Sequence, residues 1–238
     1  MRVLIYNDEG VSAFSLKETL RTFRPLSDEI EVVDHHYLIE KEWGKKTKLL
    51  VIPGGRDIPY DRNLRGKGTK KIRQFVEKGG SYLGSCAGAY FGCNEVIFEK
   101  GKPLEVHEKR DLKFFPGAAV GTLYDIPFCY VSRKGLHPAE ISFEGKIFNL
   151  YYNGGCSFKD AEHYPSVKVL ARYEDAQHQS AIIHCKVGKG NVILSGVHFE
   201  VCPKALKQEG GDPVIIDKLE TSDPQRETLI HSILRHLL

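Results

Sequence analysis

The segment Gly84-Ser85-Cys86-Ala87-Gly88 holds a cysteine two positions from a glycine on either side. An apolar-tending run ends just before it, and the stretch after it, 89–92, can begin a helix. A Gly-x-nucleophile-x-Gly segment between a strand and a helix is typical of a nucleophile elbow, a tight turn that exposes the reactive atom. Glycine is needed there because a side chain would collide with the neighbouring strand or helix. A helix N-terminus aimed at the sulfur would favour the thiolate, which is the form that attacks carbon.

A possible base lies far downstream, in Gly196-Val197-His198-Phe199-Glu200. A cysteine nucleophile needs a general base and a group that orients this base. His198 and Glu200 are two positions apart, so on an extended segment their side chains leave the same face. Glu200 could therefore hold one ring nitrogen of His198 while the other nitrogen faces Cys86.

The third requirement is a pair of donors for a developing oxyanion. The backbone N–H of Ala87, directly after the nucleophile, is one donor in the geometry of an elbow. Gly54 and Gly55 form a second glycine-containing loop, and a glycine N–H can come close to a reacting carbonyl. We therefore expect Gly55 and Ala87 to form an oxyanion hole.

The elements that must position these residues alternate in the first half of the chain. Apolar runs predict strands at 2–6, 29–33 and 48–52, and a further strand ends just before Cys86. Apolar residues at helical spacing predict helices at 11–23 and 69–78. Continuous apolar strands separated by amphipathic helices indicate an α/β fold with a parallel sheet covered on both faces. Active sites of such sheets lie at the carboxyl ends of the strands, where Cys86 follows its strand.

The second half predicts antiparallel strands, at 114–123, 139–143, 146–151, 167–173 and 180–187. A turn at Gly188-Lys189-Gly190 predicts a hairpin with a strand at 191–195, which would deliver His198 just beyond its end. The chain ends in a predicted helix that Ser222 or Asp223 can cap. Its apolar stripe favours docking onto the core, with a dimer surface as the alternative, and comprises Leu229, Ile230, Ile233, Leu234, Leu237 and Leu238.

Composition excludes several classes of protein. The 238 residues include 41% hydrophobic and 27% charged residues, which is ordinary for a soluble globular protein. The net charge of +3 is too small, and the basic residues too scattered, to indicate nucleic-acid binding. The chain has no apolar run long enough for a membrane span, and it starts with a predicted strand, so we expect a cytoplasmic protein.

Metal and cofactor sites are not expected either. The six cysteines form no Cys-x-x-Cys pair, so most should be free, buried thiols. The adjacent side chains of His35 and His36 would diverge on a strand and lack further ligands at suitable spacing.

Three segments resemble the class I glutamine amidotransferase-like superfamily, in order and in spacing. They are Val51-Ile52-Pro53-Gly54-Gly55, the Cys86 elbow, and Leu194-Ser195-Gly196-Val197-His198-Phe199-Glu200. Within the superfamily the chain is most similar to the amidotransferase-like domain at the N-terminus of eukaryotic-type biotin–protein ligases. That similarity rests on 53–60, on 82–92 and on Tyr151-Tyr152-Asn153-Gly154-Gly155.

The resemblance covers nearly the whole chain and implies one domain, 1–238, with a flavodoxin-like sheet and a triad of Cys86, His198 and Glu200. Two departures from the superfamily concern the substrate. Typical glutaminases carry Gly-His-Gln after the nucleophile, where this chain has Gly88-Ala89-Tyr90, and His-Pro-Glu, where it has His198-Phe199-Glu200. These departures leave open whether glutamine or another amide is the substrate. The chain shows neither a synthetase domain nor the glycine-rich adenylate loop of a biotin ligase.

Several residues around the elbow are candidates for substrate binding, each with a plainer alternative. Asn153 and Gly154 could present polar groups to a ligand or simply form a turn. Asp57 and Tyr60 could line the pocket or belong to a solvated loop. Gly54 and Tyr90 complete the set of candidates.

Three functional hypotheses follow. The first is a cysteine amidohydrolase or amidotransferase-like enzyme acting on a small-molecule amide, without a cofactor. The second is a non-catalytic binding or regulatory module that works with a biotin ligase or synthetase on a separate chain. The third is a peptidase of the same superfamily, which would need an open cleft beside Cys86. For Cys86 itself a buried structural thiol is the alternative, and for His198 and Glu200 a satisfied polar pair.

Overall fold

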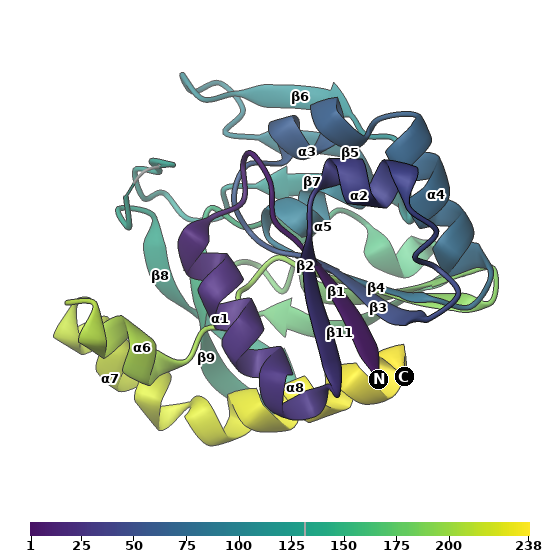
Figure 1. Ribbon diagram of the computed structural model, residues 1–238. Helices are drawn as coiled ribbons and strands as arrows, with labels where there is room; N and C mark the ends of the chain where they lie inside the picture. The colour runs from purple at the N-terminus through teal and green to yellow at the C-terminus, as the bar shows by residue number, and fades with distance from the viewer. Residues whose placement is uncertain (131) are drawn as a thin grey trace.

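A nine-stranded sheet runs through the centre of the protein (Figure 1) in the computed structural model, which describes residues 1–130 and 132–238. The first five strands in spatial order are parallel, and the remaining four are antiparallel to their neighbours. This arrangement confirms the predicted α/β class, with antiparallel strands in the second half. In spatial order the strands are β2 (Glu29–Val33), β1 (Arg2–Tyr6), β3 (Thr47–Ile52), β4 (Ser81–Ser85), β13 (Gly190–Ser195), β12 (Ser180–Val187), β11 (Val167–Tyr173), β8 (Leu136–Phe143) and β9 (Lys146–Asn153).

Helices cover both faces of this sheet because both faces of its central strands are apolar. In β1, Val3 and Ile5 point into a core that also contains side chains of α1 (Ala13–Phe23) and α8 (Asp223–Leu237). Leu4 and Tyr6 point the other way, into a core shared with four helices. These are α2 (His35–Glu40), α3 (Asp57–Leu64), α4 (Lys67–Glu77) and α5 (Ala87–Phe91).

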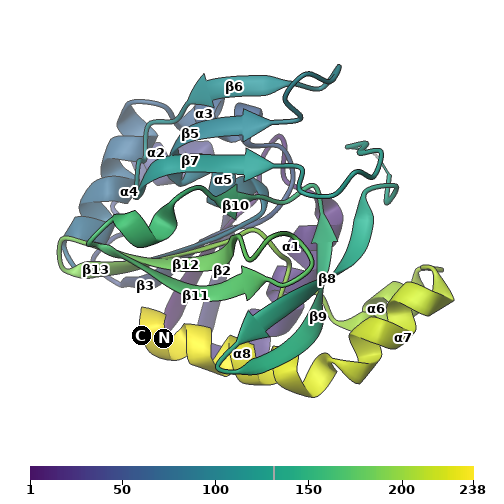
Figure 2. The same ribbon diagram turned by 180° about the vertical axis from the view of Figure 1, so that it is seen from behind.

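A separate four-stranded sheet packs beside the parallel part (Figure 2). Its order is β10 (Ser157–Phe158), β7 (Phe115–Gly121), β5 (Cys93–Phe98) and β6 (Val106–Lys109). The predicted strand at 114–123 is therefore real, but its assignment to an all-antiparallel series is wrong, because β7 pairs parallel with β5. The sequence pattern did not predict β5, β6 or β10. Asn94 and Glu95 interrupt the apolar run of β5, the edge strand β6 is mostly polar, and β10 has only two residues.

The C-terminal helix α8 docks onto the core as the stripe predicts, with Leu229, Ile233 and Leu237 buried and the terminal Leu238 exposed. Ser222 precedes it at the capping position but makes no capping hydrogen bond. Its hydroxyl oxygen instead accepts the backbone N–H of Asn149, at 2.8 Å, and so ties the start of the helix to β9. Two short helices, α6 (Pro203–Gln208) and α7 (Pro213–Thr221), connect the site to α8.

The region of His35 and His36 differs from the expectation of a strand. Both residues begin α2, whose start is capped by the side chain of Asp34, and their rings lie 4.0 Å apart. Among the described residues no three His, Cys, Asp or Glu side chains are grouped as a metal site. No helix of the described ranges is long and apolar enough to cross a membrane.

Candidate functional site

The three predicted site segments lie side by side because they follow adjacent parallel strands. Ile52 of β3 pairs with Gly84 of β4, and Ser85 of β4 pairs with Ser195 of β13. The loops that leave these strands therefore start at the same edge of the sheet. The sequence alone could not establish this meeting of distant segments, which depends on the strand order.

Cys86 occupies a strained turn between β4 and α5. Its φ is 49°, in the left-handed region that residues other than glycine seldom adopt. A Cβ on Gly84 would lie 2.3 Å from the carbonyl oxygen of Gly88, and a Cβ on Gly88 would lie 2.0 Å from that of Ile52. Both glycines are thus required by close packing, as the elbow pattern predicts. The helix behind Cys86 is only five residues long, so it offers less of a dipole than expected.

His198 is hydrogen-bonded to Glu200, one of the two partners that the sequence predicts for it. Its Nδ1 lies 2.8 Å from Oε1 of Glu200, and the two side chains are buried. Burial alone would lower the pKa of His198, but the charge of Glu200 and hydrogen bonds to Cys86 and Glu200 raise it to about 10. The backbone N–H of His198 donates to the carbonyl of Tyr151, at 2.8 Å, which fixes the segment against β9. The arrangement can hold an imidazolium beside the sulfur of Cys86.

Ser15 of α1 joins this cluster, although no sequence motif points to it. Its hydroxyl donates to Oε1 of Glu200 at 3.1 Å and accepts the N–H of Gly54 at 2.9 Å. Ser15 therefore connects the carboxylate to the glycine loop. A signal existed in the sequence, because the helix that follows β1 must start at the same edge of the sheet as the other three loops.

The two backbone N–H groups that the sequence predicts as oxyanion donors belong to Gly55 and Ala87. Among the described residues, neither the N–H of Gly55 nor that of Ala87 has a hydrogen-bond partner. Gly55 has a φ of 152°, and a Cβ there would lie 2.0 Å from the carbonyl oxygen of Gly10. Only glycine fits this position, which brings the loop close to the start of α1.

Of the candidate residues in and after the glycine loop, some line the cavity and one packs behind the loop. Gly54 lies directly against the site, since a Cβ there would be 2.5 Å from Cε1 of His198. Asp57 lines a pocket beside Cys86, but its carboxylate is paired with the buried Arg110 at 2.7 Å. Burial raises the pKa of Asp57 despite that ion pair. Tyr60 is fully buried behind the loop, where its hydroxyl lies 3.3 Å from the carbonyls of Pro53 and Gly54, so it supports the loop.

The candidates on the opposite wall lie at the sulfur. The Sγ of Cys86 is 3.8 Å from the carbonyl oxygen of Asn153 and 3.9 Å from that of Gly154. Oδ1 of Asn153 is buried and lacks a hydrogen-bond donor among the described residues. Tyr90 lines the pocket with its ring, while its hydroxyl donates to the carbonyl of Gly155 at 2.9 Å. Because this hydroxyl already donates to a backbone carbonyl, it is not free to donate to a substrate.

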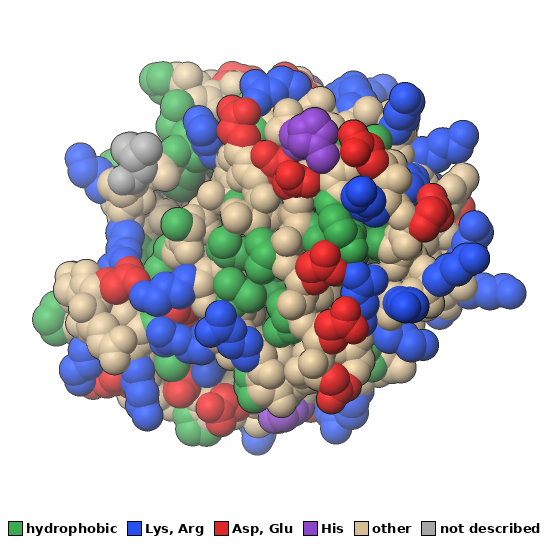
Figure 3. All heavy atoms as spheres, in the orientation of Figure 1, with side chains coloured by type: hydrophobic (Ala, Val, Ile, Leu, Met, Phe, Trp, Pro, Cys, Tyr) green, Lys and Arg blue, Asp and Glu red, His purple; other side chains and the backbone are tan. Residues whose placement is uncertain are grey.

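Two hollows meet at Cys86. The outer cavity, of about 520 Å³, is lined by both Cys86 and His198, together with aromatic and arginine side chains. Figure 3 shows a notch at this edge of the molecule, above α6 and α7, with Lys and Arg side chains around it. The inner pocket has only about 20 Å³ of free space and does not reach His198. Phe128 and Tyr130 line both hollows, and no sequence motif points to either residue.

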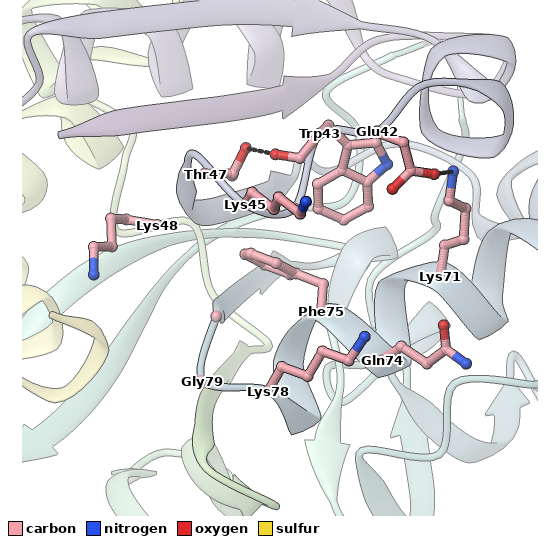
Figure 4. A pocket seen from close by; sticks show the side chains of 12 residues that line it. Glu42, Trp43, Lys45, Thr47, Lys48, Lys71, Gln74, Phe75, Lys78 and Gly79 are labelled. Atoms are coloured by element: carbon pink, nitrogen blue, oxygen red, sulfur yellow. Dashed lines mark hydrogen bonds and ion pairs between the residues drawn. The ribbon is translucent and has the colours of Figure 1, made fainter.

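A further hollow, of about 430 Å³, lies at the other end of the sheet, where β3 and β4 begin (Figure 4). Trp43 and Phe75 form its base with ring centroids 4.9 Å apart, and lysines surround it. Lys71 is paired there with Glu42 at 3.2 Å. None of the predicted site residues lines this hollow.

Comparison with known proteins identifies the family. The family model described as biotin-protein ligase, N terminal, matches residues 1–238. The chain is 44% identical to an uncharacterized protein of Chlamydia muridarum, over 87% of this chain and 84% of that protein. It is 40% identical to a biotin–protein ligase of Schizosaccharomyces pombe, over the full length of this chain and 38% of the ligase. The chain thus spans well under half of that relative.

Solved structures show the same fold at low sequence identity. A crystal structure of a glutamine amidotransferase matches with a TM-score of 0.59 and 20% identity, over 83% of this chain and 90% of that one. A glutamine amidotransferase from Thermotoga maritima matches with a TM-score of 0.56 and 15% identity, over 99% of this chain and 95% of the other. The chain therefore belongs to the biotin–protein ligase N-terminal family and has the fold of class I glutamine amidotransferases.

Proposed function

We propose that this protein is a cysteine-dependent amide hydrolase or acyl transferase. The observation that carries the proposal is the meeting, at one edge of the sheet, of a strained cysteine, a buried His–Glu pair and two unpartnered N–H groups. The strained backbone of Cys86 and the unpartnered N–H groups each cost stability in the absence of a function.

The reaction would proceed through a thioester. The thiolate of Cys86 attacks the carbonyl carbon, and the oxyanion accepts hydrogen bonds from the N–H groups of Gly55 and Ala87. His198 then gives a proton to the leaving nitrogen as the C–N bond breaks, and the acyl group stays on Sγ. Water, or another acceptor, gives a proton to His198 and attacks the thioester, which releases the acyl group and regenerates the cysteine. Glu200 orients the imidazole and stabilises its charged form.

Trapping the acyl-enzyme tests this mechanism. We expect an activated acetyl ester to leave one acetyl group on Cys86, detected by intact mass and by peptide mapping. The Cys86→Ala variant should keep its fold, measured by circular dichroism, and form no adduct. Turnover of any amide at the same rate in this variant would contradict the proposal.

A second candidate function is a non-catalytic module that acts with a biotin ligase or synthetase. The matched region in a biotin–protein ligase and the small free volume of the inner pocket favour it. Here Cys86 and His198 would shape a binding pocket. Co-purification of a ligase with the protein, undiminished in Cys86→Ala and without any acyl-enzyme, would support this function over catalysis.

A further inference from the structure

The position of the general acid assigns the two hollows to the two halves of a substrate, if the proposed function is correct. His198 must reach the leaving nitrogen, and it lines the outer cavity but not the inner pocket. The oxyanion lies at Gly55 and Ala87. The leaving amine therefore occupies the outer cavity, and the acyl chain has only the inner pocket available.

The inner pocket admits only a small acyl group. Its free space of about 20 Å³ is little more than the space that one water needs. Val96, Phe98 and Phe128 form apolar walls, and a Cβ on the neighbouring Gly154 would lie 2.3 Å from the ring of Phe128. Asp57, the one carboxylate among the described residues that line this pocket, is already paired with Arg110. A glutamyl group is too long for this pocket, and its α-ammonium group would find no free carboxylate among the described lining residues.

The outer cavity is positively charged. No Asp or Glu is among the described residues that line it, whereas Arg133 is, and so is Arg56, which also borders the inner pocket. Arg133 shares Glu209 with Lys17, so one carboxylate faces two cations. The exposed Arg56 has no ion-pair partner among the residues that the structure describes, and its guanidinium lies 5.8 Å from the ring centroid of Tyr130. An anion in this cavity would find an unneutralised arginine.

The remaining wall of the outer cavity suits a flat, apolar body. Four aromatic side chains line it: Phe14, Phe128, Tyr130 and Tyr151. The volume of about 520 Å³ falls in the usual range for small-molecule sites, about 300–1,000 Å³.

We infer that the substrate is a short-chain acyl derivative, such as a formyl or acetyl amide, of an anionic amine with an aromatic or apolar body. Cys86 would take the small acyl group as a thioester. The anionic amine would leave through the outer cavity with the proton from His198. A carboxylate or phosphate on that amine would contact Arg56.

Activated esters with matched leaving groups test this inference on the full chain. The probes are para-acetoxybenzoate, its neutral analogue para-acetoxybenzamide, and para-octanoyloxybenzoate. Acylation of Cys86 is followed by intact mass, and each rate is divided by that of the same ester with N-acetylcysteine. We expect the anionic acetyl ester to react about fivefold faster than the neutral one, the effect of one exposed ion pair. The octanoyl ester should be slower by at least about tenfold, since its chain exceeds the inner pocket.

Variants show whether Arg56 causes the preference. Arg56→Gln should bring the ratio of anionic to neutral rates close to one. Arg235→Gln, which removes the same charge from an exposed position of α8, should leave the ratio at its wild-type value. Free glutamine should give no ammonia.

The possible outcomes separate this inference from the proposed function. If Cys86 is acylated by all three esters without a charge or length preference, the substrate class is wrong while the nucleophile stands. Release of ammonia from glutamine would likewise overturn the inference alone. If no ester acylates Cys86 faster than the other cysteines, the proposed function fails and the inference fails with it.

Discussion

The hydroxyl oxygen of Ser15 lies 3.1 Å from Oε1 of Glu200, a residue 185 positions further along the chain. The same hydroxyl accepts the N–H of Gly54 at 2.9 Å. One buried serine on α1 thereby holds both the carboxylate behind His198 and the loop that ends in Gly55.

Replacing Ser15 should therefore reduce activity as well as stability. Ser15→Ala leaves the N–H of Gly54 without an acceptor, which should lower the free energy of unfolding by about 1–3 kcal/mol. Because Glu200 also loses a donor, we expect the acylation rate of Cys86 to fall about tenfold. Ser232→Ala, at a buried serine of α8 bonded to Glu144, is the control. An unchanged acylation rate in Ser15→Ala would show that Ser15 is only structural.

Gly54→Ala should strongly reduce the acylation rate of Cys86. Its Cβ would lie 2.5 Å from Cε1 of His198 and 3.4 Å from Cβ of Cys86, so the imidazole must move. A displacement of about 1 Å typically costs about a hundredfold in rate. Gly44→Ala, whose Cβ would meet nothing nearer than 3.6 Å, is the matched control. Equal acylation rates in the two variants would rule out the described positions of His198 and Gly54.

The charge of His198 should persist well above neutral pH. Its pKa of about 10 in the folded protein exceeds the value of about 6.5 for an unperturbed histidine. NMR of the imidazole should show a protonated ring at about pH 8, and Glu200→Gln should shift its titration to lower pH. A ring that is neutral at pH 8 in the wild type would contradict the ion-pair description.

The same shift predicts how stability depends on pH. Since the folded state binds this proton more tightly, the stabilisation is complete below about pH 6.5 and is lost as the pH rises towards about 10. Urea unfolding should therefore show a larger loss of stability over this range in the wild type than in His198→Gln. An equal loss of unfolding free energy in the two proteins between about pH 6.5 and about 10 would contradict this prediction.

Tyr90 should contribute to stability through its hydroxyl. Tyr90→Phe removes one of the two hydroxyl donors to the buried carbonyl of Gly155, the other being Tyr152, so we expect a loss of about 0.5–1.5 kcal/mol in urea unfolding. Tyr124→Phe, which removes a less buried hydroxyl bonded to Asp175, should cost less. A stability of Tyr90→Phe equal to wild type would show that this hydrogen bond is not formed in solution.

Much of the fold follows from local pattern. The strands at 2–6 and 29–33 and the hairpin before His198 are found where apolar runs and turn glycines predict them. Of the second sheet the sequence predicts only β7, because Asn94 and Glu95 interrupt the apolar run of β5 and the edge strand β6 is mostly polar. Strand β7 reads as an ordinary antiparallel strand, and only the long-range pairing with β5 reveals otherwise.

The sequence predicts the nucleophile of the candidate site better than it predicts the residues that surround the nucleophile. The glycines around Cys86 mark a turn whose close contacts are local and therefore visible in the sequence. Ser15 and Arg56 reach the site only because α1 and the glycine loop meet at one sheet edge. Tyr60 is predicted either to line the pocket or to belong to a solvated loop, yet its ring is buried behind the loop, a direction that sequence spacing does not determine.

The most direct test of the central claim is competitive labelling of the six cysteines. The native protein is treated briefly with a small chloroacetamide, and each cysteine-containing peptide is quantified by mass spectrometry. If Cys86 is an activated nucleophile, it should be labelled fast although its side chain is buried, and His198→Ala should lose this preference. Slow or indiscriminate labelling of Cys86 in the folded protein would contradict an assembled nucleophile.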